Sequence, residues 1–284
     1  MKPLRLGVVG TGAWGRNYVR TIASMGEATL ARVAGRADWR ELVRASDVDA
    51  LIVAVPPAAQ PEIALAAIEA GRPLLLEKPL ALSVEAAEQI VAAAAAHSVL
   101  VMVDHVHLFH PAWEVLKRAA AQRGPLRSIE AEAGNLGPYR AGVSTLWDWG
   151  PHDVAMCIDL LGVPQEVDAE RLEARPAGAG SAERLRLDLG FAGGVAARIE
   201  LNTLREKHRR FSVQLDSGAL LYDAAPPADA AQLPLARALR AFAGAVAEGA
   251  TALDQVQLGA AVVRVLALCE ARLAARSGKF ARQS

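Results

Sequence analysis

One lysine of the sequence stands where it could polarise a reacting oxygen. Lys78 lies between Glu77 and Pro79, directly after the apolar run 74–76, and it is one of only five lysines against 26 arginines. Ligands of open parallel sheets bind beyond the carboxyl ends of the strands, so we expect its ammonium group to face a ligand crevice. There it would polarise a hydroxyl or carbonyl oxygen or assist proton transfer. The alternative is a surface lysine near a strand end.

A second group of ionisable residues lies in the segment 147–153, which reads WDWGPHD. Pro151 is typical of the first turn of a helix, so we expect a helix to begin here and do not assign Asp148 and His152 to one helix face. A carboxylate beside an imidazole can fix its tautomer and stabilise its protonated form, which makes a general base near neutral pH. The same spacing also fits helix capping, and Asp153 is interpreted as a cap.

A glycine pattern of the kind that binds dinucleotides follows the first apolar run. It comprises Gly10, Thr11, Gly12, Ala13, Trp14 and Gly15. In such a loop the glycines allow a tight turn and a close approach of a pyrophosphate, and the next helix offers its N-terminal amides. A purely structural glycine turn is the alternative.

The acidic residue that usually holds the adenosine ribose, about 20 residues further on, is missing. The second expected strand ends before Gly35 and Arg36, and the nearest acid, Asp38, is interpreted as a helix cap. Arg36 would suit a 2′-phosphate, and a solvated loop arginine is the equal alternative. Both NAD and NADP therefore stay open as cofactors.

Three histidines, His105, His107 and His110, raise the question of a metal site. No cysteine or second carboxylate cluster completes one nearby, so we expect no metal and assign these side chains to a crevice or to packing, with His105 as a candidate substrate contact. A solvated strand end or an oligomer contact, with an anionic substrate tail as the alternative, is the interpretation of the basic cluster Arg205, Lys207, His208, Arg209 and Arg210. At least one of Trp147 and Trp149 is interpreted as a core or domain-interface residue, with stacking on a sugar ring as the alternative.

The order of apolar patterns predicts two domains. From residue 4 to about 123, expected strands at 4–10, 28–34, 50–55, 73–77 and 99–106 alternate with helical patterns. This alternation predicts a Rossmann-type, doubly wound parallel α/β domain over residues 1–123, which would bind the dinucleotide.

After Gly124 the apolar residues recur at a period near two, at 127–134, 182–191, 193–203, 208–216 and 219–223. Helices are expected at 151–162, 235–249 and 254–276. We therefore expect residues 124–284 to form an α+β domain with a mostly antiparallel open sheet. The last helices are free to pack back on the first domain.

Composition excludes several classes of protein. The chain has 284 residues, 52% of them hydrophobic, and 31 basic residues balance 31 acidic ones. A disordered chain would have fewer apolar residues and a larger net charge, and a general nucleic-acid binder would have an excess of basic residues. The longest apolar runs are interrupted by His97 and Arg264, which predicts no membrane span, and two distant cysteines indicate a reducing compartment, the cytoplasm.

Four segments together resemble the Gfo/Idh/MocA family of NAD(P)-dependent oxidoreductases. They are GTGAWG at 10–15, the turn Val55-Pro56-Pro57, LLLEKPLA at 74–81 and WDWGPHD at 147–153. The resemblance covers almost the whole chain. It implies that the sheet of residues 124–284 shapes the substrate pocket on one side and builds a dimer or tetramer on the other. It also implies a cofactor site that includes Val55, Pro56, Pro57 and Glu77.

The resemblance also implies roles for three residues in hydride transfer between a sugar carbinol and the nicotinamide. His152 would be the acid/base, Asp148 would orient it, and Lys78 would polarise the reacting oxygen. The stretch 135–153 is most similar to members acting on nucleotide sugars and amino sugars. With His105 and Trp147, which are candidates from their residue types, the expected substrate contacts are Lys78, His105, Asn135, Tyr139, Arg140, Trp147 and His152.

The chain departs from the family pattern in the adenosine half. The acid after the second strand is missing, and the unit between Arg36 and Asp47 is shortened by about a helix and a strand. Gln60 stands where many members have histidine. Two alternatives to a dehydrogenase stay open: redox-neutral oxidation and elimination on a tightly bound cofactor, and a non-catalytic dinucleotide-binding regulator.

Overall fold

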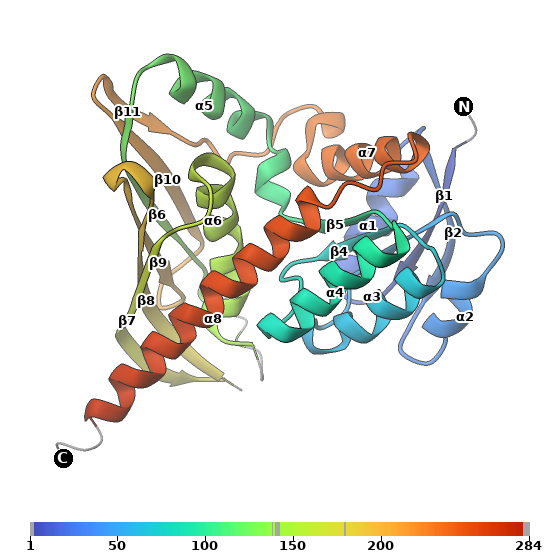
Figure 1. Ribbon diagram of the computed structural model, residues 1–284, viewed down its shortest axis with the longest axis horizontal. Coiled ribbons are helices and arrows are strands. Elements are labelled where there is room, and N and C mark those ends of the chain that lie inside the picture. Colours follow the sequence, from blue (N-terminus) through green and yellow to red (C-terminus); the bar gives the residue numbers. More distant parts are fainter. Residues whose placement is uncertain (1–2, 138, 140–142, 179, 281–284) are drawn as a thin grey trace. The chain divides into compact units, whose positions relative to one another are not determined.

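The computed structural model describes residues 3–137, 139, 143–178 and 180–280, and these form two compact units (Figure 1). The first unit combines Met1–Phe109 with Pro226–Val263, and the second combines His110–Ala225 with Arg264–Ser284. This grouping differs from a division at 123/124. The helix before Gly124 belongs with the second unit, and a late segment returns to the first.

The first unit is a parallel sheet between two layers of helices. Its strands are β1 (Leu4–Val9), β2 (Ala28–Ala34), β3 (Ala50–Val53), β4 (Leu74–Glu77) and β5 (Val101–Asp104), in the order β2-β1-β3-β4-β5. Its helices are α1 (Ala13–Ala23), α2 (Trp39–Arg44), α3 (Gln60–Glu69), α4 (Val84–His97) and α7 (Pro234–Ala247), with the first part of α8 (Asp254–Phe280). The predicted Rossmann-type sheet is confirmed.

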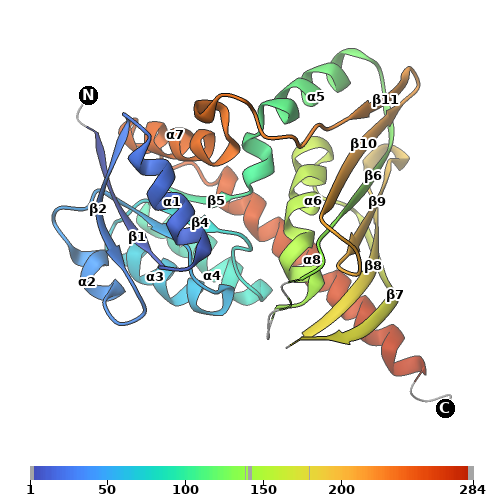
Figure 2. The same ribbon diagram turned by 180° about the vertical axis from the view of Figure 1, so that it is seen from behind.

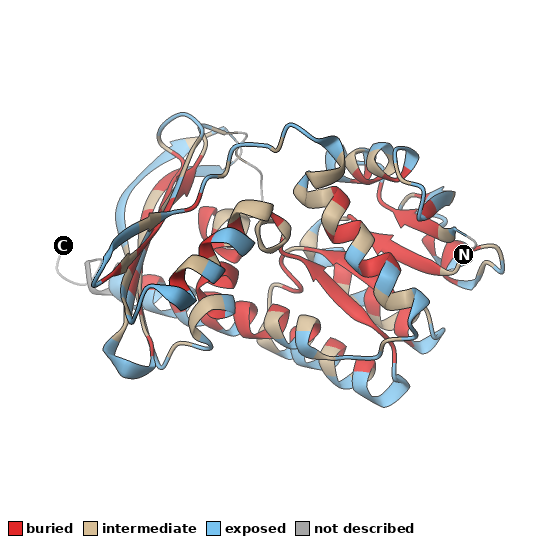
Figure 3. Cartoon of the chain, turned by 90° about the horizontal axis from the view of Figure 1, so that it is seen from above, coloured by how far each residue is buried: buried red, intermediate tan, exposed pale blue. Residues whose placement is uncertain are grey.

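Burial explains why these strands are nearly all apolar. Strands β3, β4 and β5 are buried at every position because helices cover both faces of the sheet. Figures 1 and 2 show α3 and α4 on one face and α1 and α7 on the other, and Figure 3 shows the buried strands between them. Phe242 of α7 packs in the same apolar cluster as Tyr18 and Ile22 of α1.

The strand order reverses between β1 and β3. These two strands pair with each other, and on their other edges β1 pairs with β2 and β3 pairs with β4. Ligands of doubly wound sheets bind beyond the carboxyl ends of the strands at such a reversal. The chain segment between Arg36 and Asp47 contains only the short helix α2, so β2 is the edge strand next to β1. The glycine loop, which follows β1, therefore lies at the reversal.

The second unit is a mixed sheet with helices. Its strands are β6 (Leu126–Gly134), β7 (Glu166–Ala177), β8 (Gly180–Gly190), β9 (Ala196–Asn202), β10 (His208–Leu215) and β11 (Gly218–Leu221), in the order β11-β10-β6-β9-β8-β7. Among the described strand pairs of this sheet, only β6–β9 is parallel. The helices are α5 (Pro111–Gln122), α6 (Thr145–Leu161) and the later part of α8. The predicted, mostly antiparallel open sheet is confirmed.

Side chains of opposite character occupy the two faces of this sheet. Helix α6 packs on one face, where Leu187, Ile199 and Phe211 are fully buried. On the other face arginines and carboxylates pair across strands: Asp188 accepts from Arg198 at 2.8 Å, and Glu200 accepts from Arg184 at 2.7 Å. The period-two pattern of the sequence is this alternation.

Candidate functional site

The glycine loop between β1 and α1 is shaped by two glycines that no other residue could replace. Gly10 has φ of 120°, and a Cβ atom there would lie 2.2 Å from the carbonyl oxygen of Ala54. A Cβ atom on Gly15 would lie 1.9 Å from the carbonyl oxygen of Gly10. Both contacts are far inside van der Waals distance, so these glycines bring helix and strands together.

Gly12 differs from its neighbours because it faces open space. A Cβ atom on Gly12 would meet nothing within 4 Å, and residues 11–14 are exposed. Gly12 is also the N-cap of α1, and no side chain caps this helix or adds an acid to its first turn. Free N-terminal amides and the positive end of the helix dipole bind anions. This donor set fits the pyrophosphate of a dinucleotide.

The end of β2 presents a cation and a carboxylate. Arg36 lies exposed in the turn after β2. Helix α2 begins after Asp38, as expected, but the Asp38 side chain makes no capping bond to that helix. Its Oδ1 instead accepts from the backbone N–H of Gly35 at 2.7 Å. The interpretation of Asp38 as a helix cap was therefore wrong for its side chain. That side chain instead stabilises the loop in which an adenosine ribose would be expected.

The backbone on both sides of Lys78 is fixed by hydrogen bonds. The Gln60 side chain, at the start of α3, donates from Nε2 to the carbonyl oxygens of Glu77 at 2.7 Å and Pro79 at 2.8 Å. The N–H of Lys78 donates to Glu77 Oε2 at 3.1 Å. Lys78 itself is half-buried and follows β4 directly, as the sequence predicted. The turn Val55-Pro56-Pro57 follows β3 at the same edge of the sheet.

A buried group of acids beside Lys78 was not found from the sequence. Tyr18 Oη on α1 lies 2.9 Å from Glu77 Oε1 and 2.5 Å from Asp104 Oδ2. Burial raises the pKa of Glu77 and that of Asp104, and the charge of Asp104 adds to the shift at Glu77. One sequence signal could have indicated that the two carboxyl groups meet: Glu77 and Asp104 are the last residues of two strands that are neighbours in the sheet.

His105, one residue past β5, is the most deeply buried of the three neighbouring histidines. It is 2% exposed, and neither ring nitrogen has a hydrogen-bond partner in the described part of the chain. Burial and the nearby charge of Lys78 lower its pKa to about 3, so the ring is neutral. A neutral imidazole with one donor and one acceptor suits contact with a polar ligand.

The other two histidines separate from His105. The chain turns into a 3-10 helix at Val106–Phe109, so His107 does not share an extended face with His105. His110 caps α5: its Nδ1 accepts from Ala112 N–H at 3.1 Å, and its Nε2 therefore donates to the Ala225 carbonyl oxygen at 3.1 Å. Among the described residues no three His, Cys, Asp or Glu side chains group to hold a metal ion.

Helix α6 places Asp148 and His152 differently from the expectation. The helix begins at Thr145, where Ser144 caps it by accepting from Trp147 N–H, and Pro151 lies inside it. The predicted helix start at Pro151 was wrong by about two turns. Ser144 supplies the N-cap, so Pro151 lies inside the helix and not in its first turn. Asp148 and His152 are four residues apart in one helix and therefore share a face.

Asp153 is not a cap. It is fully buried, and its two carboxylate oxygens accept from Arg209 of β10 at 2.8 and 3.2 Å. This ion pair joins α6 to the sheet directly beside His152. Arg205, from the same basic cluster, pairs with Glu132 of β6, so two of the cluster's arginines have structural partners within the second unit.

Three expected substrate contacts have hydrogen bonds within the second unit. Asn135 Nδ2 donates to the Gly137 carbonyl at 2.9 Å, and Tyr139 Oη donates to the Thr203 carbonyl at 2.7 Å. Trp147 is buried, and its Nε1 donates to Glu270 of α8 at 2.9 Å. Arg140 lies outside the described residues. The aromatic ring of Trp147 is thus a packing element of α6.

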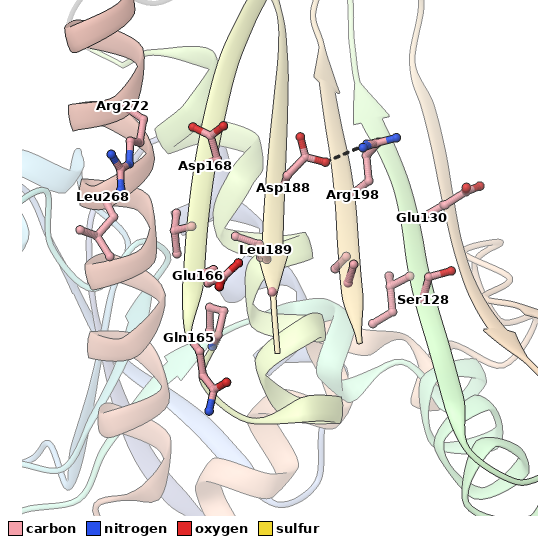
Figure 4. A pocket seen from close by; sticks show the side chains of 16 residues that line it. Ser128, Glu130, Gln165, Glu166, Asp168, Asp188, Leu189, Arg198, Leu268 and Arg272 are labelled. Atoms are coloured by element: carbon pink, nitrogen blue, oxygen red, sulfur yellow. Dashed lines mark hydrogen bonds and ion pairs between the residues drawn. The ribbon is translucent and has the colours of Figure 1, made fainter. Parts of the chain in front are cut away.

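A cavity of about 800 Å³ lies on the second unit along β6, β9, β8 and β7 (Figure 4). Leu268 and Arg272 of α8 lie at one side of it, and Asp188 and Arg198 are paired within it. None of the residues predicted to be catalytic lines this cavity. We therefore do not place the reaction there.

Comparison with known proteins agrees with this geometry. Residues 27–105 match the family model described as "Oxidoreductase family, NAD-binding Rossmann fold". The solved structure of a putative oxidoreductase from Magnetospirillum magnetotacticum is 39% identical, covers 94% of this chain and 100% of its own, and superposes with a TM-score of 0.84. No described helix is long and apolar enough to cross a membrane.

Two curated relatives are named as dehydrogenases. Inositol 2-dehydrogenase 2 of Saccharopolyspora erythraea is 30% identical over 56% of this chain and 54% of its own length. UDP-N-acetylglucosamine 3-dehydrogenase of Acidithiobacillus ferrooxidans is 26% identical over 74% of this chain and 71% of its own. The chain spans about half the length of the first curated relatives that it matches.

Proposed function

Because the chain belongs to the Gfo/Idh/MocA family of oxidoreductases, we propose that it is an NAD(P)-dependent dehydrogenase of a ring carbinol in a sugar or nucleotide sugar. One observation is the main support. The uncapped glycine loop and the firmly held Lys78 lie at the carboxyl ends of strands in one parallel sheet, where such sheets bind ligands.

The cofactor would be held by the glycine loop and the strand ends beside it. Amides of residues 12–15 would bind the pyrophosphate, the end of β2 with Arg36 would meet the adenosine, and Val55, Pro56, Pro57, Glu77 and Lys78 would line the path between them. When bound, the nicotinamide supplies the oxidising or reducing equivalent. The exposed Arg36 and Asp38 leave both NAD and NADP open, and this choice is tested below.

The second unit would supply the acid/base. His152 would accept the proton of the reacting hydroxyl, and Asp148, one turn earlier on the same face of α6, would stabilise the resulting imidazolium. The ammonium of Lys78 would polarise the reacting oxygen, which stabilises negative charge as it develops. The Asp153–Arg209 pair would keep the α6 backbone fixed beside His152.

The substrate is proposed as a polyhydroxylated ring. His105 would contribute a neutral hydrogen-bonding group, and Asn135, Tyr139 and Arg140 would border the substrate in the second unit. A sugar or cyclitol offers secondary hydroxyls in a rigid array, and the two curated relatives are named for such compounds. Arg140 would suit the phosphate or carboxylate of an extended substrate.

The remaining expectations concern assembly and compartment. We propose a homo-dimer or homo-tetramer through the second sheet. Its charged face has complementary arginines and carboxylates that a second copy could meet. Both cysteines, Cys157 and Cys269, are buried and free, which suits a cytoplasmic protein.

A turnover assay tests the proposed function. The protein is mixed with NAD or NADP and a panel of inositols, free sugars and UDP-sugars, and reduced cofactor is measured by its absorbance. The proposal expects accumulation of reduced cofactor with at least one member of the panel. Cofactor that copurifies and never accumulates in reduced form while substrate is consumed would instead indicate redox-neutral elimination. Cofactor binding without any turnover would indicate a regulator.

A further inference from the structure

Three buried polar side chains of the first unit meet at one point, and the proposed mechanism gives no role to two of them, Tyr18 and Asp104. Tyr18 Oη of α1 contacts Glu77 Oε1 at the end of β4 and Asp104 Oδ2 at the end of β5, at 2.9 and 2.5 Å. Glu77 and Asp104 are directly paired in the sheet and are 8% and 2% exposed. We refer to Tyr18, Glu77 and Asp104 as the tyrosine–carboxyl cluster.

The number of protons in the cluster follows from its hydrogen bonds. Each short contact between two oxygen atoms requires a proton between them. The phenol of Tyr18 has one proton and can donate to only one carboxylate. The other contact needs a proton that belongs to Glu77 or Asp104. Burial favours this state, because two carboxylates and no added proton would leave two charges without sufficient solvation.

The cluster is attached to the backbone of Lys78. Glu77 uses its second oxygen, Oε2, to accept from the Lys78 N–H at 3.1 Å. Gln60 donates to the carbonyl oxygens of the residues before and after Lys78, so the backbone of this segment has hydrogen bonds from two side chains. The other ionisable groups next to the cluster are Lys78, after β4, and His105, after β5, and the positive charge of Lys78 acts on both Glu77 and His105.

We propose that Tyr18, Glu77 and Asp104 share one carboxyl proton and serve as positioning residues for Lys78. With the proton bound, the cluster has a single negative charge that balances one ammonium group. Glu77 then keeps its oxygen on the Lys78 N–H. Loss of the proton places a second negative charge in the same buried volume, which weakens the packing of α1 on the strand ends and draws the ammonium of Lys78 toward the cluster. Only the role of Lys78 rests on the proposed function.

The sign of the pH effect is fixed by the bound proton. A carboxyl group that keeps its proton in the folded state and loses it in the unfolded state stabilises the fold at low pH. This contribution is fully present below the ordinary carboxyl pKa, and it is lost as pH rises through the raised pKa of the folded state. Stability of the ligand-free protein should therefore decline from mildly acidic pH toward mildly alkaline pH.

Infrared spectroscopy of the ligand-free protein tests the shared proton without any substrate. At about pH 7 the wild type should show the C=O stretch of a protonated carboxyl group, well above the range in which carboxylates absorb. Asp104→Asn and Glu77→Gln should remove or shift this band. The exposed carboxyl variant Glu62→Gln is the matched control and should keep it. A wild type without the band, or a band that persists unchanged in both cluster variants, would overturn the proposal.

Stability and turnover test the positioning role. The thermal midpoint of the wild type should fall by several degrees between about pH 5 and about pH 8, and that of Asp104→Asn should fall much less. Asp104→Asn keeps a polar partner for Tyr18, so its kcat should be at least about ten times that of Asp104→Ala. It should also lose most of the pH-dependent decline of the thermal midpoint. Equal kcat in these two variants, or equal pH dependence in Asp104→Asn and wild type, would contradict the proposal. If no substrate turns over, the infrared and thermal results still decide the shared proton.

Discussion

At the scale of single residues, the proposed chemistry depends on a lysine that its neighbours hold rigidly. The Lys78 N–H is bonded to Glu77, and the carbonyl groups on either side are bonded to Gln60. Sequence reasoning found Lys78 because a rare residue type followed an apolar strand. It could not find Tyr18, because its contacts with Glu77 and Asp104 span 59 and 86 residues of chain and leave no local pattern. It also missed Asp104, although its position at the end of a strand was a signal.

Replacement of Lys78 tests its role at the reacting oxygen. Lys78→Ala should lower kcat by roughly 100-fold or more, because an electrostatic donor at a developing charge contributes on this scale. Steady-state kinetics with the substrate found in the panel measures the effect. Lys117→Ala is the control: Lys117 pairs with Asp159 in the second unit, and its loss should leave kcat close to wild type. Comparable kcat in Lys78→Ala and wild type would remove Lys78 from the mechanism.

At the scale of elements, the sequence predicts those helices and strands whose pattern of apolar residues follows directly from which of their faces are buried. The apolar strands β3 to β5 and the helices between them were identified because both faces are covered. Strand β7 was missed because it is an edge strand with only one fully buried position, Ala169, and therefore no clear alternation. The start of α6 was misplaced because Pro151 looks like an N-terminal residue although it lies within the helix.

The glycine loop allows binding to be separated from folding. Gly12→Ala should change the free energy of unfolding by less than about 1 kcal/mol, since the new Cβ atom meets no protein atom. It should weaken NAD(P) binding by about tenfold or more, because that space is where the pyrophosphate would approach. Calorimetric titration and chemical denaturation measure the two effects. Gly10→Ala is the contrast and should destabilise by more than about 2 kcal/mol, given its φ of 120°. Undiminished affinity in Gly12→Ala would refute this placement.

The buried pair between α6 and β10 should be a strong structural determinant. Arg209→Met leaves the fully buried carboxylate of Asp153 without its partner, which should cost about 3–5 kcal/mol. The double variant Arg209→Met with Asp153→Asn removes the uncompensated charge and should regain part of that loss. Urea denaturation of the wild type and the variants measures both differences. A single variant as stable as the wild type would show that the carboxylate is neutral or solvated.

At the scale of the whole molecule, any ligand that binds the folded state alone raises its apparent stability. We expect NAD(P) to raise the thermal midpoint of the protein. Arg36→Ser should lower the affinity for NADP about tenfold and so reduce the shift that NADP causes, because the 2′-phosphate loses a cationic partner. Asp38→Asn should instead affect the shift caused by NAD. Thermal-shift titrations with both cofactors decide between them. Identical NADP titrations in Arg36→Ser and wild type would exclude Arg36 from the adenosine site.

The path of the chain through the two compact units has a consequence for its synthesis. The first unit needs Pro226–Val263, which are made after the whole of His110–Ala225, and the second needs the later part of α8, which is made after both of these segments. Neither unit can therefore be completed while the preceding residues leave the ribosome. A chain that stops before residue 254 would lack Gly259, which packs on Leu80 and Val103, and also Glu270, the partner of Trp147. Premature termination late in translation should thus leave two unfinished cores, each a ready target for chaperones and proteases.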